Sequence, residues 1–356
     1  MMNRDRTERE IPVAYMRTAA SGKQGLVKEA VYPVYNYIDS SRQLVTDRRI
    51  DAGEAGRATV SGEAIMKSCN VYLPAGYDEI DLDTCYNVLY LLHGVGGDQY
   101  EWLRGGIEGG NYILCNVLDN LIANGDIDPV IVVMSNGRSS HDWKDCTFNT
   151  EGTNILGFYY FDYELRYDLI PFIESTFKTY ANIRETSPEA VEYNRMHRAI
   201  TGLSMGGMQA LNLILGGYRC DSASIAGMES GWRNGLVTTV PAQGMTDLFA
   251  YVGAFSNAPT SSNGKILGES ISLKGYKLRL LYMTCGDADD ISIDCYAQSI
   301  DGLADNAGDY LDEYCQVQIK DGVHDFKLWY SGVYRFIRLL FGNGGVHAKS
   351  KVGGIL

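Results

Sequence analysis

The sequence predicts an α/β fold, in which helices cover both faces of a mainly parallel β-sheet that has an antiparallel pair of strands at its N-terminal edge. Apolar runs of strand length alternate with longer amphipathic segments, as in successive βαβ units. These runs are almost continuously apolar, as expected of strands buried on both faces of a sheet. The chain has 356 residues, of which 45% are hydrophobic and 21% are charged, so it can bury a substantial core.

The predicted strands and helices follow one another along the chain. Five apolar runs predict buried strands, and each ends at a turn rich in Gly, Ser or Asp: residues 88–92, 130–134, 198–201, 251–255 and 278–284. Three segments between them have apolar residues at helical spacing: residues 113–124, 163–176 and 208–215. A last strand at 315–319 and a helix from Trp329 complete the pattern.

The N-terminal region, about residues 26–85, contains two strands at 31–38 and 68–73 that we expect to pair antiparallel, with an exposed insertion at 47–62. No Pro-rich or Ser-rich linker and no internal repeat divides the chain, so we expect residues 1–356 to form a single domain. The polar stretch 227–246 predicts a surface loop or a lid, of which the loop is the simpler interpretation. Residues 343–356 are expected to form a flexible tail.

Charge and composition exclude several classes of function. The formal net charge of −13 argues against nucleic-acid binding, which needs clustered Lys and Arg. No run of about 18 apolar residues predicts a membrane-spanning helix. The first ten residues lack the apolar stretch of a secretory signal, so the sequence as given predicts a cytoplasmic protein, unless a leader has been removed. The eight cysteines form no metal-binding pattern, and we expect them to be buried and reduced.

Residues 202–206 read Gly-Leu-Ser-Met-Gly, with Ser204 at the centre, between the strand at 198–201 and the helix at 208–215. A strand, a sharp turn that carries a Ser, and a helix make up the nucleophile elbow of the α/β-hydrolase fold. The flanking glycines allow the strained turn. Because Gly-x-Ser-x-Gly also occurs by chance in ordinary glycine-rich turns, a catalytic role for Ser204 depends on finding its partners.

A serine hydroxyl needs a nearby imidazole to accept its proton and a carboxylate to orient that imidazole. In this fold the acid and then the His follow the Ser in the chain, so only His324 and His347 qualify as the base. His347 lies in the glycine-rich tail. His324 lies in a turn between the predicted strand 315–319 and the helix from Trp329, where a loop-borne base is expected. The alternative for His324 is an exposed loop histidine.

The acid is expected at the end of the preceding strand. The strand 278–284 leads through a Cys-Gly pair to three carboxylates, Asp287, Asp289 and Asp290. Spacing alone does not choose among them. Two of the three would then be ordinary turn aspartates.

Two backbone N–H groups are expected to stabilise the oxyanion of an acyl-transfer reaction. One belongs to Met205, the residue after Ser204. The second is expected from the turn after the strand 88–92, where residues 93–97 read His-Gly-Val-Gly-Gly. His93 precedes the serine in the chain, so we expect it to brace this loop by hydrogen bonds rather than to transfer a proton.

Six segments together resemble the putative-esterase family of α/β-hydrolases: residues 90–97, 136–138, 168–174, 198–207, 253–256 and 322–326. This family includes microbial feruloyl (cinnamoyl) esterases and acetylxylan esterases, and the resemblance extends from about residue 71 to residue 341. In the feruloyl-esterase branch the acid is the Asp of a Cys-Gly-x-x-Asp pattern, which implies Asp289 in this chain. The resemblance also implies Val95 as the second oxyanion donor.

The chain departs from that branch in several places. Residues 47–62, 227–246 and 301–309 form longer segments than usual there, which affects the entrance to the site. Gly96 and Gly97 stand where S-formylglutathione hydrolases carry a Thr-Cys pair, which argues against that activity.

The resemblance implies a serine esterase that hydrolyses feruloyl or other hydroxycinnamoyl esters of plant cell-wall sugars, with no metal or organic cofactor. The expected partner is a small-molecule or oligosaccharide ester, and the sequence does not indicate the oligomeric state. Acetylxylan and other short acyl esters are the alternative, ahead of an acyltransferase or a catalytically silent binding protein. We expect His93, Gly94 and Trp143 to contact substrate. Other aromatic residues after the strand 130–134 are expected mainly to pack the core.

Overall fold

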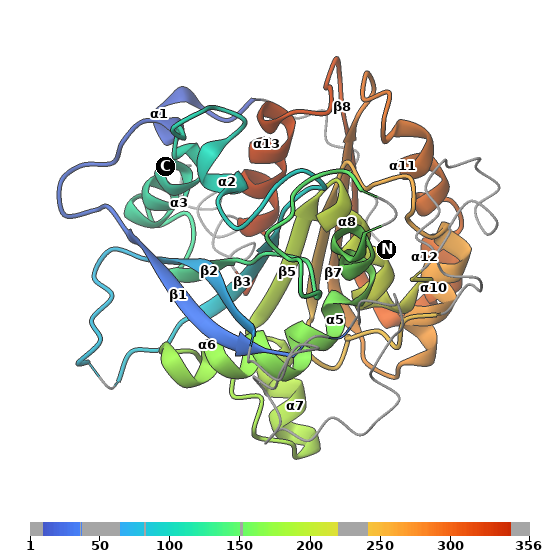
Figure 1. The fold of residues 1–356 in the computed structure, drawn as a ribbon, viewed down its shortest axis with the longest axis horizontal. Coiled ribbons are helices and arrows are strands. Elements are labelled where there is room, and N and C mark those ends of the chain that lie inside the picture. Colours follow the sequence, from blue (N-terminus) through green and yellow to red (C-terminus); the bar gives the residue numbers. More distant parts are fainter. Residues whose placement is uncertain are drawn as a thin grey trace, which may run out of the picture.

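The computed structural model describes residues 10–35, 37, 65–81, 83–149, 152–219 and 241–342. Its centre is an eight-stranded sheet with the order β1-β2-β4-β3-β5-β6-β7-β8 (Figure 1). The strands are β1 Leu26–Val34, β2 Ile65–Leu73, β3 Asn87–Leu92, β4 Val130–Met134, β5 Arg198–Leu203, β6 Tyr251–Phe255, β7 Leu278–Gly286 and β8 Leu311–Ile319. The six strands from β4 to β8 in this order run parallel, which confirms the predicted fold class.

The antiparallel edge predicted for the N-terminal region is present. β1 pairs with β2 along its whole length, and β2 joins β4 through only three pairs, Asn70 with Met134, Val71 with Val133 and Tyr72 with Val132. β1 begins five residues earlier than expected. The early part of this edge strand is mostly exposed or half-buried and includes Lys28 and Glu29, so it lacks the continuous apolar run that marks a central strand.

The central strands match their predicted positions closely. β4 and β6 have the predicted bounds, and β3, β5 and β7 are each longer by one or two residues. Every residue of β3, β4, β5 and β6 is buried, which explains their continuous apolar runs. The last residue of β5, Leu203, pairs with Phe255 of β6, and Ser204 follows it directly in the chain.

Helices cover both faces of the sheet. The α-helices are α1 Val13–Met16, α2 Glu101–Arg104, α3 Ile113–Ala123, α4 Thr153–Leu156, α5 Phe161–Glu164, α6 Ile170–Thr176, α7 Pro188–Arg195, α8 Met205–Gln209, α10 Gly264–Leu273, α11 Ile293–Ile300, α12 Leu303–Ala307 and α13 Phe326–Ile337. Apolar side chains of α2, α3 and α13 form one core, and those of α6, α10 and α12 form another. Figure 1 shows α2, α3 and α13 together, apart from α10, α11 and α12.

Two helical segments differ from the prediction of regular α-helices. Residues 163–176 contain the π-helical turn Leu165–Leu169 between α5 and α6, and residues 208–215 continue from α8 into the π-helix Ala210–Gly216. A search for apolar residues at a spacing of 3.6 cannot detect the wider hydrogen-bonding step of a π-helix. Residues 301–309, expected as an added stretch, form α12 and the 3₁₀ turn Gly308–Tyr310, and α12 packs on α10.

Several sequence predictions fall outside the described residues: the insertion 47–62, residues 227–240 of the expected loop or lid, and the tail 343–356. The described end of that loop packs into the protein, because Met245 donates its N–H to the carbonyl of Ile214 and is buried. Of the cysteines in the described ranges, Cys69, Cys285 and Cys295 are free and buried as expected, whereas Cys85, Cys115 and Cys146 are free but only partly buried. Within those ranges, we find no helix with the length and apolarity needed to cross a membrane.

Candidate active site

Ser204 occupies a strained turn between β5 and α8. Its backbone angles are φ 50° and ψ −113°, which a non-glycine residue adopts only when its surroundings enforce them. The enforcing contacts are hydrogen bonds of 3.0 Å: Ser204 donates its N–H to the carbonyl of Phe255, and its own carbonyl accepts from Met208 and Ala258. The turn predicted from the sequence is therefore present and is fixed by hydrogen bonds, with the serine at the N-terminal end of α8.

The glycines of the elbow permit close packing. A Cβ atom at Gly202 would lie 2.6 Å from the carbonyl carbon of Gly206, and one at Gly206 would lie 2.8 Å from the carbonyl oxygen of His93. Real Cβ contacts are never this short, so a side chain at either position would push the elbow away from its neighbours. The second contact also brings the turn of Ser204 against the loop that follows β3.

His324 and Asp289 form a hydrogen-bonded pair at the ends of β8 and β7. Nδ1 of His324 lies 3.0 Å from both carboxylate oxygens of Asp289. Burial raises the pKa of Asp289, but its hydrogen bonds, with that of His324 the strongest, outweigh this, so its pKa is lowered overall and it is a carboxylate at neutral pH. A carboxylate accepts hydrogen bonds, so Nδ1 carries the proton and Nε2 is left as the basic nitrogen.

The other two candidate acids have different surroundings. Asp287 accepts the N–H of Asp321 at 2.6 Å, which ties the turn after β7 to the loop that carries His324. Asp290 is exposed, whereas Asp289 is fully buried and also accepts the N–H of Ser292. Among the described residues, Asp289 is thus the carboxylate that faces His324.

The acid and base loops touch through their backbones. A Cβ atom at Gly286 would overlap the carbonyl oxygen of Gly322, and that same carbonyl accepts the N–H of Ala288 at 3.0 Å. Gly286 and Gly322 therefore allow the end of β7 to lie directly on the turn that precedes His324. Both glycines stood in motifs read from the sequence, but their mutual contact joins positions far apart in the chain and was not predicted.

His93 holds the loop after β3 as the sequence led us to expect. Its Nε2 accepts the N–H of Gly137 at 2.9 Å, so Nδ1 carries the proton and donates to the carbonyl of Gly94 at 2.7 Å. Burial keeps the pKa of His93 well below its ordinary value, so the ring is neutral. The carbonyl of Gly94 and the N–H of Val95 belong to one peptide group, so this hydrogen bond fixes the direction of the Val95 N–H, the predicted second oxyanion donor, and polarises it.

Two charged residues that sequence reasoning missed also hold this loop. The carboxylate of Glu101 accepts the N–H of Gly94 at 2.6 Å, and burial raises its pKa. The guanidinium of Arg138 donates to the carbonyl of Val95 at 2.6 Å and lies over the ring of Phe158. Nothing in the sequence marks either residue as a hydrogen-bond partner of this loop, because each contact joins segments that are separate in the chain.

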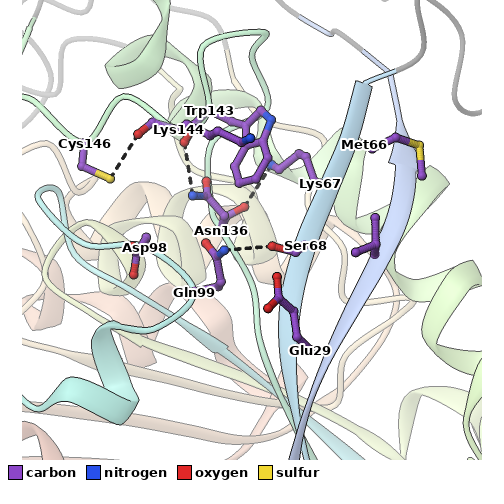
Figure 2. Close-up of a pocket in the computed structure, with 11 residues that line it drawn as sticks. Glu29, Met66, Lys67, Ser68, Asp98, Gln99, Asn136, Trp143, Lys144 and Cys146 are labelled. Atoms are coloured by element: carbon purple, nitrogen blue, oxygen red, sulfur yellow. Dashed lines mark hydrogen bonds between the residues drawn. The ribbon is translucent and has the colours of Figure 1, made fainter. Parts of the chain in front are cut away.

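The three predicted substrate contacts lie in different surroundings. A Cβ atom at Gly94 would lie 2.8 Å from Cδ1 of Leu203 and 3.5 Å from Cβ of Ser204, so this glycine lets the loop after β3 pack closely against the elbow. His93 is buried and uses both ring nitrogens within the protein. Trp143 lines a pocket of about 440 Å³, together with residues of β1, β2 and the loops after β3 and β4 (Figure 2). Within the described ranges, no group of His, Cys, Asp and Glu side chains could hold a metal ion.

Two curated relatives match part of the chain. Endo-1,4-β-xylanase Y of Acetivibrio thermocellus is 37% identical over 157 residues, which make up 44% of this chain and 12% of that protein. An endo-1,4-β-xylanase/feruloyl esterase of Xylanibacter ruminicola is 36% identical over 146 residues, 40% of this chain and 17% of the relative. The matched part is thus a small fraction of each of these longer proteins.

Solved structures share the fold, and a family model identifies the chain. The feruloyl esterase module of Clostridium thermocellum, determined with sinapinate, has a TM-score of 0.64 at 21% identity and covers 95% of both chains. A ferulic acid esterase of the anaerobic fungus Anaeromyces mucronatus has a TM-score of 0.63 at 19% identity, over 96% of this chain and 99% of the other. These matches confirm the predicted fold. Residues 66–262, more than half of the chain, match the model of the family described as "Putative esterase", so this chain belongs to that family of ester hydrolases.

Proposed function

We propose that this protein is a serine carboxylesterase in which Ser204, His324 and Asp289 form the catalytic triad. The observation that carries the proposal is the pairing of His324 with a buried Asp289 carboxylate, at the same edge of the sheet as a serine in a strained elbow. A nucleophile on such a turn, an imidazole with a free Nε2 and an orienting acid are the parts that acyl transfer requires.

In the first half of the proposed reaction, the hydroxyl of Ser204 attacks the ester carbonyl while Nε2 of His324 takes its proton. Asp289 stabilises the resulting imidazolium. The oxyanion accepts hydrogen bonds from the N–H groups of Met205 and Val95, which are held before the reaction and need no reorganisation. His324 then donates the proton to the departing sugar oxygen, leaving an acyl group on Ser204.

In the second half, water attacks the acyl-enzyme. His324 takes a proton from the water, the same two N–H groups stabilise the second oxyanion, and the proton returns to Ser204 as the carboxylic acid leaves. Each proton transfer uses a residue of this chain.

The proposed acyl group is feruloyl or another hydroxycinnamoyl group, esterified to a plant cell-wall sugar. The relative from Xylanibacter ruminicola is described as a xylanase and feruloyl esterase, and its match supports this choice. The pocket lined by Trp143 gives an aromatic acyl group a place to bind. Acetyl and other short acyl esters are the second candidate, since they need no such pocket.

Labelling with a fluorophosphonate tests the nucleophile, and substrate comparison tests the acyl group. We expect the probe to label the folded protein at Ser204 and to leave Ser204→Ala unlabelled. We expect kcat/KM to be higher on methyl ferulate than on p-nitrophenyl acetate, and lowest on S-formylglutathione. Failure to label Ser204 would contradict the esterase mechanism, whereas a clear preference for the acetyl ester would overturn only the acyl group.

A further inference from the structure

A buried lysine that takes no part in the proposed reaction bonds to the loop after β4. Lys67 lies on β2, and only 1% of it is exposed. Its ammonium donates to the carboxylate of Glu164 at 2.8 Å and to the carbonyl of Arg138 at 2.7 Å. It also donates to the carbonyl of Asn136 at 3.1 Å (Figure 2). All three partners are acceptors, so Nζ uses three N–H donors and carries its positive charge.

Stability alone does not explain this buried ion pair. Burial lowers the pKa of Lys67, and the charge of Glu164 opposes that effect. Uncharged residues of similar volume can often replace a buried ion pair with no loss of stability. The backbone contacts of the ammonium therefore point to a second role for Lys67.

The contact with Asn136 leads to the oxyanion loop through one peptide group and one ring. The carbonyl of Asn136 shares its peptide with the N–H of Gly137, which donates to Nε2 of His93 at 2.9 Å. His93 donates from Nδ1 to the carbonyl of Gly94 at 2.7 Å, and that carbonyl shares its peptide with the N–H of Val95. Three hydrogen bonds in series thus join the ammonium to the proposed second oxyanion donor.

Every donor in this series is directed toward the oxyanion. The ammonium polarises the first peptide, whose N–H then binds the imidazole more strongly, and the imidazole donates more strongly to the second peptide. A positive charge lies at one end, and the proposed negative charge of the oxyanion forms at the other. The series is therefore most favourable in the transition state, and no proton moves along it.

The contact with Arg138 leads to the other side of Val95. The ammonium holds the carbonyl of Arg138, and the guanidinium of the same residue donates to the carbonyl of Val95 at 2.6 Å. The two peptide groups that flank Val95 are thus both held, one by His93 and one by Arg138. The carbonyl of Gly137 accepts separately from Gln209 at 2.9 Å. Without the ammonium, we expect the loop after β4 to stay in place but to lose its alignment.

We propose that Lys67 is a positioning residue for the oxyanion hole, and that its ammonium aligns and polarises the N–H of Val95 through the loop after β4. Lys67 acts through other residues in this role and does not touch the reacting atoms. Glu164 holds the ammonium charged in the interior. This inference rests on the proposed serine esterase mechanism, and it assigns part of the transition-state stabilisation to a residue of β2.

The test uses a double variant, because removing Lys67 alone would leave the carboxylate of Glu164 buried without its charge partner. Lys67→Met/Glu164→Gln removes both charges and keeps side chains of similar length. On p-nitrophenyl acetate we expect kcat to fall by about 10- to 100-fold, which is less than the roughly 100- to 1,000-fold expected for loss of a whole oxyanion donor. KM should change little, because the lost interaction belongs to the transition state.

A second measurement reports on the oxyanion hole itself. In p-nitrophenyl thionoacetate, sulfur replaces the carbonyl oxygen, and sulfur is a weaker hydrogen-bond acceptor that gains less from the N–H donors. The ratio of kcat/KM on the oxygen ester to that on the thionoester should therefore fall by about 10-fold in the double variant. This ratio is taken within one protein, so it does not depend on the fraction of the protein that is folded.

Three further variants keep the result specific to Lys67. Glu164→Gln retains an acceptor oxygen and leaves the ammonium on both carbonyls, so its ratio should stay near that of the unaltered protein. Lys67→Leu/Glu164→Gln repeats the loss with another apolar side chain, and the ratio should fall again. Arg198→Met/Glu174→Gln is the matched control: that ion pair is also buried, but Arg198 begins β5 at the end opposite Ser204, so the ratio should not change.

The outcomes separate this inference from the proposed function. An unchanged ester to thionoester ratio without Lys67, or an equal fall in Arg198→Met/Glu174→Gln, overturns the role of Lys67 and leaves the esterase intact. A higher KM with an unchanged kcat also overturns it, because Lys67 would then act in substrate binding. If the unaltered protein hydrolyses neither ester and a fluorophosphonate does not label it, the proposed function fails and this inference fails with it.

Discussion

The loops on the two sides of Ser204 are held by different kinds of contact. On the acid and base side, the closest contacts are between backbones, where Gly286 lies on Gly322 and Ala288 donates to the Gly322 carbonyl, and the side chain of Asp287 adds one bond from the N–H of Asp321. On the oxyanion side, polar side chains hold the backbone: His93, Glu101 and Arg138 each bond to Gly94 or Val95. The first side therefore depends on shape, and the second on hydrogen bonds whose partners can be changed one at a time.

The largest expected effect on kcat comes from replacing the proposed acid on the acid and base side. Asp289→Asn should lower kcat by about 10⁴-fold, because an amide beside His324 favours the wrong tautomer and cannot stabilise the imidazolium. Asp287→Asn should lower it far less, since Asp287 accepts only a backbone N–H and an amide oxygen can do the same. Steady-state kinetics on methyl ferulate measures both. Equal losses would mean that the acid has been assigned to the wrong carboxylate.

A methyl group at the glycine contact tests whether the acid and base side depends on shape. In Gly286→Ala the new Cβ would overlap the Gly322 carbonyl, so the two loops should separate. We expect the free energy of unfolding to fall by about 2–3 kcal/mol and kcat to fall by about 100-fold. Chemical denaturation and kinetics provide the two values. Wild-type values for both would show that this backbone contact is dispensable.

The corresponding change on the oxyanion side removes a hydrogen-bond acceptor. Glu101→Ala leaves the buried N–H of Gly94 without a partner, so the loop should shift and kcat should fall by about 10-fold. Glu101→Gln retains an acceptor oxygen and should recover most of that loss, with little change in KM in either variant. If Gln and Ala reduce kcat equally, the acceptor is not what positions the loop.

The prediction with the smallest expected effect on kinetics concerns the pH dependence of stability. Burial, with the nearby charge of Glu164, raises the pKa of Asp168 from 3.8 to about 8. A raised pKa means that the folded protein binds this proton more tightly than the unfolded chain, so stability falls as pH rises from about 4 to about 8. The carboxyl group of Asp168 accepts a hydrogen bond from the hydroxyl of Tyr37. Lys67, which lines the pocket, donates to the neighbouring Glu164.

Asp168→Asn should therefore lose less stability than the unaltered protein between pH 4 and pH 8, as measured by urea denaturation across that range. Kinetic parameters at neutral pH should change little, because Asp168 contacts no residue of the proposed triad. The exposed Asp305 supplies the control, since Asp305→Asn should leave the pH curve unaltered. Parallel curves for Asp168→Asn and the unaltered protein would show that this carboxyl does not titrate between these limits.

The sequence predicted the parallel sheet well because strands buried on both faces produce continuous apolar runs. The predictions of element bounds and helix type failed where the structure does not follow the local pattern of apolar residues. The edge strand β1 begins in a mostly exposed stretch, and the π-helical turns do not follow the 3.6-residue period.

The candidate site was predictable where its parts are contiguous in the chain. Ser204 sits in a recognisable motif, and His324 lies at the expected point after it. Spacing could not distinguish Asp289 from its neighbours, because the distinguishing contact is with a residue 35 positions away. The roles of Glu101 and Arg138 were missed because a hydrogen bond from a charged side chain to the backbone of another segment depends on how those segments pack.

The narrow attachment of the N-terminal strands has a consequence for how such enzymes diversify. β1 and β2 supply a wall of the pocket, yet three residue pairs between β2 and β4 join them to the rest of the sheet. The residues of the proposed triad follow β5, β7 and β8. The lining of this pocket can thus be altered by exchanging or reshaping a peripheral hairpin, while the strands that carry the proposed triad remain as they are.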